Sequence, residues 1–130
     1  MTFYKSLMAA TAVAFLGSVA PSFAQTQADQ LKVAYQAARN QLGILGYCAD
    51  KGFTDTAAAD VQKKLIAMIP VPADVSGGDA AEAAGRKGTI SAMGMEQNIE
   101  AIAKAMNGTP ASYCKQIGDL VKQMGAKLPQ

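Results

Sequence analysis

The chain has 130 residues, with 12 basic and 10 acidic side chains and a net charge of +2. It contains no histidine, which removes the commonest general base and metal ligand from consideration. The nearly neutral charge, without a basic run, argues against nucleic acid as a partner.

The first 24 residues have the pattern of a secretory signal peptide. Lys5 precedes a mostly apolar run over residues 7–19, and a Ser-Phe-Ala cleavage motif ends at Ala24. The apolar run is shorter than the roughly 20 residues that a membrane-spanning helix needs. The alternative is a buried or membrane-anchoring N-terminal helix. We expect cleavage after Ala24, leaving residues 25–130 as one domain in the periplasm or outside the cell.

The first predicted helix covers residues 27–48, and Gly52 is its expected stop signal. Its apolar side chains recur at spacings of four and three, as on one face of a helix. They are Leu31, Tyr35, Ala38, Leu42, Leu45 and Ala49.

A second helix is expected after Thr54 or Asp55, because either side chain can cap its first N–H groups. Pro70 ends this helix, since proline has no N–H to donate. Its predicted stripe consists of Ala58, Val61, Leu65 and Met68. Residues 70–79, with two prolines and two glycines, are expected to form a loop.

Residues 80–106 predict either one kinked helix or a short helix followed by a longer one. Gly85 and Gly88 weaken the first part, since each interior glycine costs a helix about 1 kcal/mol. From Thr89 on, one helical face is predicted for Ala92, Met95, Ile99, Ile102 and Met106. No strand-like alternation is evident, and Asn107-Gly108 is a helix stop signal.

The last helix has the clearest start, with Thr109 as its N-cap and Pro110 as its first residue. Its predicted buried face carries Cys114, Ile117, Val121 and Met124, with Tyr113 and Leu120 beside it. Amphipathic helices of this length need partners to bury their apolar faces. The sequence therefore predicts an all-α fold, a small bundle of four or five helices.

Cys48 and Cys114 are the chain's two cysteines and are predicted to form a disulfide bond, since an exported protein works in an oxidising compartment. A loop of this length implies about 4 kcal/mol of stabilisation in the chain-entropy model. Redox catalysis and intermolecular pairing are the alternatives, but no CxxC motif is present.

The glycine pairs Gly43/Gly46 and Gly85/Gly88 indicate either close helix contacts, as in membrane assemblies, or hinges. The preferred interpretation is local loosening together with helix crossing inside the bundle. Between the two cysteines, the candidate hinge residues are Gly77, Gly78, Gly85 and Gly88.

No catalytic, metal-binding or cofactor-binding set is expected. Met93-Gly94-Met95 raises the possibility of Cu(I) ligation by thioethers, but packing in the core is the preferred interpretation. The carboxylates are scattered and form no calcium loop or acid–base pair. We therefore predict that the protein is not an enzyme.

Two stretches carry a family resemblance: YQAARNQLGILGYCADKGF (residues 35–53) and ASYCKQIGDLVKQMGAKLP (residues 111–129). They resemble small exported alphaproteobacterial proteins labelled as pore-forming and similar to early-secreted mycobacterial antigens. The resemblance implies contact with membranes and assembly of several copies into a homo-oligomeric pore. The alternative function is a periplasmic protein-binding module, such as a chaperone, an inhibitor or an immunity protein.

Overall fold

The computed structural model describes residues 23–129 of the chain, with side chains from residue 26 onward. The predicted signal peptide lies outside this part, except for residues 23 and 24 in the first turn of the first helix. The elements in chain order are α1 (Phe23–Asp50), α2 (Ala57–Ala67), α3 (Ser76–Arg86), β1 (Thr89–Ala92), β2 (Met95–Asn98), α4 (Ile99–Ala105) and α5 (Pro110–Gly125). The fold is mostly helical, as predicted.

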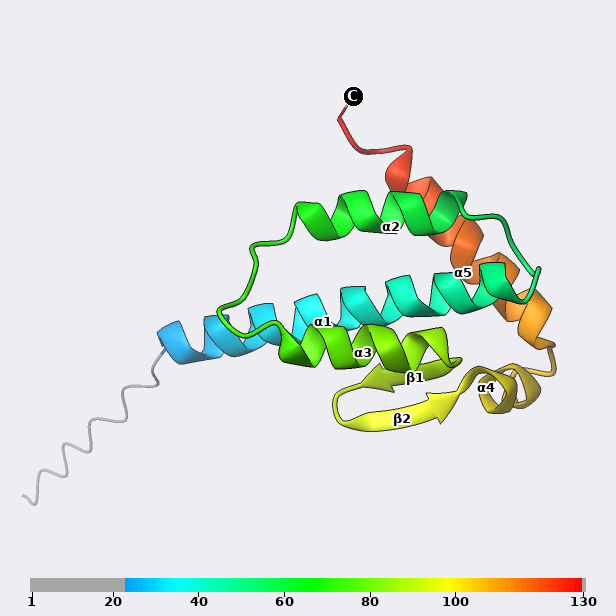
Figure 1. Cartoon of the computed structure of the whole chain (residues 1–130), viewed down its shortest axis with the longest axis horizontal. Helices are drawn as coiled ribbons and strands as arrows, with labels where there is room; N and C mark the ends of the chain where they lie inside the picture. Colours follow the sequence, from blue (N-terminus) through cyan, green and yellow to red (C-terminus); the bar gives the residue numbers. More distant parts are fainter. Residues whose placement is uncertain (1–22, 130) are drawn as a thin grey trace, which may run out of the picture.

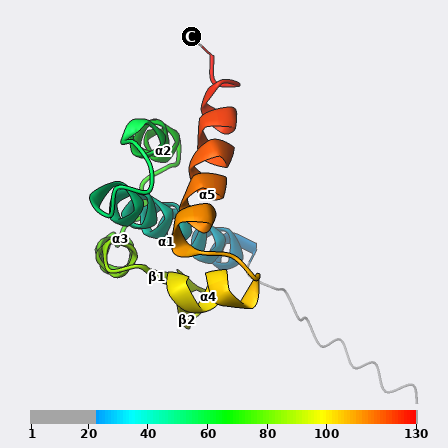
Figure 2. The same ribbon diagram turned by 90° about the vertical axis from the view of Figure 1, so that its right-hand side faces the viewer.

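The long helix α1 lies at the centre of the arrangement. Figure 2 looks nearly along α1 and shows α2, α3 and α5 around it, with α4 and the two strands below. Figure 1 shows α3 running alongside α1 and the hairpin of β1 and β2 beneath both helices. Among the described residues, no helix is both long enough and apolar enough to cross a bilayer.

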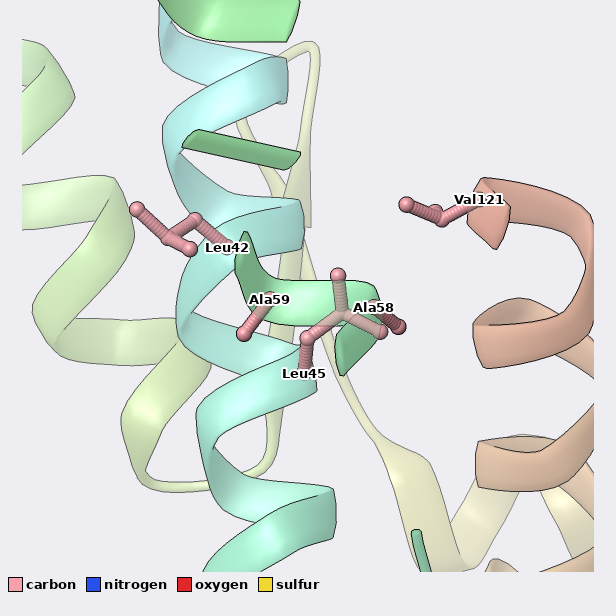
Figure 3. Close-up of a cluster of buried hydrophobic side chains, with 5 residues drawn as sticks. All are labelled: Leu42, Leu45, Ala58, Ala59 and Val121. Carbon is pink, nitrogen blue, oxygen red and sulfur yellow. The ribbon is translucent and has the colours of Figure 1, made fainter. Parts of the chain in front are cut away.

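Two clusters of buried side chains hold the helices to α1. In the first, Leu42 and Leu45 of α1 face Ala58 and Ala59 of α2 and Val121 of α5 (Figure 3). Burying a side chain of leucine size contributes about 2 kcal/mol.

The second cluster contains the predicted disulfide. Cys48 of α1 is bonded to Cys114 of α5, with 5.6 Å between their Cα atoms, and both side chains are fully buried. Ile44 of α1 and Ile99 of α4 pack around the bond. The disulfide indicates a non-cytoplasmic compartment, where such bonds persist.

Most of the helix boundary signals are confirmed. Thr109 caps α5 in a reciprocal capping box with Ser112, and Pro110 is its first residue. Asp55 accepts a hydrogen bond from the N–H of Ala57 at 3.0 Å. Gly52, with φ of 72°, follows α1, and Asn107, with φ of 54°, follows α4.

The helical prediction for residues 89–98 is wrong, because this segment is an antiparallel hairpin. Thr89 pairs with Asn98 and Ala92 with Met95, joined by a turn at Met93-Gly94. The N–H of Ile99 donates to the carbonyl of Gly88 at 2.9 Å and closes the base of the hairpin. Residues 80–106 therefore contain a helix, two strands and a short helix.

The loop prediction for residues 70–79 is also partly wrong, because α3 begins at Ser76. Asp74 starts that helix by accepting hydrogen bonds from the N–H and the hydroxyl of Ser76. Four methionines assigned to buried faces lie exposed at or near helix and strand ends: Met68, Met95, Met106 and Met124. Leu120, expected beside the buried face of the last helix, is also exposed.

Helices α1 and α3 touch through glycine, so the crossing interpretation of the glycine pairs is confirmed at this point. A Cβ atom on Gly43 would lie 2.9 Å from the Cα of Gly85, and one on Gly85 would lie 2.8 Å from the N of Ile44. Such distances leave no room for any side chain. The two backbones therefore pack directly against each other.

Candidate functional site

The described structure has an open groove of about 680 Å³. By its lining residues it lies between the N-terminal half of α1, the start of α3 and the hairpin, whereas the disulfide joins the C-terminal end of α1 to the start of α5. Its lining is Val33, Gln36, Ala37, Gly77, Ala80, Ala81 and residues 91–96. We call this cavity the hairpin groove.

The small side chains of α3 make the groove possible. Gly77, Ala80 and Ala81 line it with at most one methyl group each. Because α3 already lies close to α1 through Gly43 and Gly85, larger side chains on this face would fill the space between the two helices and the hairpin.

The tip of the hairpin projects apolar side chains at the mouth of the groove. Met93 and Gly94 have φ values of 52° and 78°, which the two-residue type I′ hairpin turn requires. Met93 is 88% exposed and Met95 is 65% exposed. The preferred interpretation of this motif as core packing is therefore wrong, since both thioethers lie at the surface.

The side chain of Asn40 fixes the position of β1. Its amide nitrogen donates to the carbonyl of Thr89 at 3.0 Å and to that of Ala81 at 2.8 Å, and its oxygen accepts from the N–H of Ser91 at 3.1 Å. One buried amide thus pairs with the outer edge of β1 in the way a neighbouring strand would. It ties α1, α3 and the hairpin together.

An ionic cluster joins α1 and α3 beside the groove. Arg39 donates to Glu82 at 2.6 Å, to Asp79 at 2.8 Å and to the hydroxyl of Tyr35 at 2.9 Å. Burial opposes the charge of Arg39, but its bonds to Glu82 and Tyr35 prevail and raise the pKa of the guanidinium. Arg39 therefore stays positive while it holds the two helices together.

A smaller cavity of about 190 Å³ is lined by residues of α1, β1 and α5. It shares Ala37, Ser91 and Ala92 with the hairpin groove. Tyr113 lines it half-buried, and burial raises the pKa of its hydroxyl, which stays protonated at neutral pH. The cavity is mainly apolar and holds no second titratable group.

The structure brings together only part of the residues singled out in the sequence. Cys48 and Cys114 meet, and the pair is buried away from the groove. Of the hinge candidates, Gly77 lines the groove, Gly78 lies next to it in the first turn of α3, and Gly85 and Gly88 lie at the other end of that helix. Whether any of the four acts as a hinge stays a prediction.

The groove itself was missed in the sequence because three distant segments build it. The signal for its hairpin was Met93-Gly94, an X-Gly dipeptide between two short stretches. The sequence carried no distinct signal for Asn40, which stands between the polar residues Arg39 and Gln41.

No cluster of three or more histidine, cysteine, aspartate or glutamate side chains suited to a metal ion is present in the described part of the chain. Comparisons with protein-family models, with curated proteins and with solved structures give no match to this chain. The functional conclusion therefore depends on the groove and its surroundings.

Proposed function

We propose that this protein is an exported, non-catalytic binding protein whose hairpin groove holds an apolar segment of another protein. The observation that carries the proposal is the exposure of Met93 and Met95 at the mouth of an open groove with an apolar floor. Methionine is flexible and polarisable, so it adapts to varied apolar partners. Amphipathic segments of proteins commonly bind in such grooves.

The chemistry of the chain supports a binding role over a catalytic one. The chain has no histidine, and both of its cysteines are oxidised in the disulfide. The carboxylates with shifted pKa values, Asp55 and Asp74, are both shifted downward by hydrogen bonds. A carboxylic acid that serves as a general acid needs a raised pKa instead.

The predicted signal peptide and the disulfide together support export. After cleavage at Ala24 and export, Cys48 and Cys114 would be oxidised to the disulfide in the periplasm or the medium. Its partner would then be another exported or envelope protein, which fits a chaperone, an inhibitor or an immunity protein.

Contact with a membrane is the second candidate, and one observation favours it. Met68, Val71 and Val75, around the connection between α2 and α3, are exposed. Figure 1 shows this connection at the same end of the molecule as the turn between β1 and β2. Protruding apolar loops of this kind can enter a lipid surface. The resemblance to exported proteins labelled as pore-forming points the same way, and a pore would require several copies.

Site-directed photo-crosslinking separates the two candidates. Benzoylphenylalanine replaces Met93 at the groove or, as the control, the exposed Met106 outside it. We expect a discrete heavier protein band from position 93, none from position 106, and loss of the band when A80R fills the groove. Flotation of the protein with phospholipid vesicles, without such a band, would overturn protein binding and support the membrane candidate.

A further inference from the structure

We infer that the partner of the hairpin groove is a cationic amphipathic helix, with apolar side chains on one face and lysine or arginine on its flanks. The inference rests on the proposed function and specifies the chemistry of the bound segment. Three observations carry it: the charge around the groove, the exposure of the carboxylates, and the size of the apolar floor.

The groove end of the molecule is acidic although the domain as a whole is not. Five carboxylates and two cations lie on residues 26–39 of α1, the connection to α3, the first turns of α3 and the hairpin, which gives this region a net charge of −3. They are Asp29, Asp74, Asp79, Glu82 and Glu96, with Lys32 and Arg39. The rest of residues 25–130 carries nine cations and five carboxylates, a net charge of +4.

Most carboxylates at this end remain accessible to a partner, although Glu82, which is bonded to Arg39, is only 21% exposed. Glu96 is exposed in the groove lining and makes no ion pair within the described structure. Asp74 and Asp79 each bind one cation, yet their side chains remain 58% and 63% exposed. The cations are engaged instead: Lys32 pairs with Asp74, and Arg39 serves both Asp79 and Glu82.

The charge has a specific consequence for the bound segment. An acidic rim attracts a cationic segment and repels an acidic one, and both effects contribute to the choice of partner. Lysine and arginine also suit the rim of an apolar groove, because their methylene stems cover apolar surface while their charges stay in water.

The dimensions of the groove fit about two turns of a helix. The wall formed by a four-residue strand is about 14 Å long, and two helical turns rise about 11 Å. Ala80 and Ala81 leave room on the floor for branched side chains, and Met93 can close over them. Apolar side chains at positions i, i+3, i+4 and i+7 would all enter it.

The experiment uses two peptides of about 18 residues that differ only in the sign of their charge. One carries leucine on one helical face and lysine on the other, and its counterpart carries glutamate in place of lysine. Binding to the disulfide-bonded protein, residues 25–130, is measured by fluorescence anisotropy in 50 mM and 500 mM NaCl. We expect the lysine peptide to bind, the glutamate peptide to stay free, and salt to weaken binding.

Matched variants locate the binding. We expect E96Q to weaken binding about threefold and E96K about tenfold, as for exposed charges. M93N removes an apolar contact worth about tenfold, and asparagine suits the positive φ of this turn, so the hairpin keeps its fold. The controls E100Q and M106N change an exposed carboxylate and an exposed methionine outside the groove, and should leave affinity within about twofold.

Each contrary outcome has a distinct meaning. If M93N weakens both peptides equally, the groove binds proteins but the inference about charge is wrong. If neither peptide binds while position 93 still crosslinks to a protein, the helix is the wrong ligand and the proposed function stands. If the lysine peptide binds M93N and E96K as well as the parent protein, it binds elsewhere and the inference fails. If the protein self-associates at low salt and M93N abolishes this self-association, a second copy of the chain occupies the groove and the inference is overturned.

Discussion

Replacing Gly43 by alanine tests the direct packing of α1 against α3. The added Cβ would lie 2.9 Å from both the N of Arg86 and the Cα of Gly85, and closer still to the carbonyl oxygen of Glu82. These are backbone atoms, so no side chain can rotate away and the two helices must separate by about 1 Å. A gap of that size forfeits a quarter to a half of the dispersion energy across the contact.

The expected cost follows from two opposing effects. Overpacking of a well-packed interface costs about 3 kcal/mol, and the better helix propensity of alanine returns about 1 kcal/mol. The net loss of about 2 kcal/mol should lower the unfolding temperature by about 10 °C for a domain of this size. Urea unfolding of residues 25–130, followed by circular dichroism at 222 nm, measures the free energy directly.

Gly118 of α5 provides the matched control, because it is a buried helical glycine with space beside it. A Cβ there would lie 3.6 Å from the Cγ2 of Thr54 and 3.8 Å from the Cβ of Ala58, which is ordinary contact. G118A should therefore leave stability unchanged or raise it by up to about 1 kcal/mol. Equal free energies of unfolding for G43A and G118A would refute the close crossing of α1 and α3.

Three further predictions concern the bonds that hold the elements together. N40A should lower the free energy of unfolding by about 3 kcal/mol in urea titrations, because it leaves buried backbone groups without partners; a loss under 1 kcal/mol would contradict the role given to Asn40. Replacing Cys48 and Cys114 together by alanine should cost about 4 kcal/mol, seen as a lower urea midpoint, and no change would refute it. The hydrogen bond from Lys122 is the main cause of the lowered pKa of Asp55. The ionised carboxylate of Asp55 therefore stabilises the folded state above about pH 4, and this stabilisation is lost as the carboxylate is protonated at lower pH. D55N should therefore bring the free energies of unfolding at pH 7 and pH 3 closer together. An unchanged difference between them would count against the ion pair of Asp55 with Lys122.

Local signals were enough to predict the helices that begin and end at strong boundary residues. Thr109 and Pro110 start α5, and the positive φ of Gly52 follows α1, where one residue type determines one backbone conformation. The disulfide was predictable because two cysteines in an oxidising compartment allow one intramolecular pair.

The hairpin was not predictable by periodicity, because each of its strands has four residues. Ala92 and Met95 are three residues apart. This spacing fits one face of a helix as well as it fits the paired residues on the two sides of a hairpin turn. The deciding information was the positive φ at Met93 and Gly94, together with the amide of Asn40, about 50 residues away in the sequence. The groove depends on that same long-range contact, so no local pattern contained it.

The bonds of Asn40 also imply an order of folding. A two-stranded hairpin is marginally stable by itself in water, and the outer edge of β1 has its partner only when α1 and α3 are already side by side. The hairpin should therefore form after the helix pair and open before it. Its amides would then exchange with solvent faster than those of α1, while the helices and the disulfide remain intact. A wall of this kind lets a partner enter through a local opening, at far less cost than unfolding the domain.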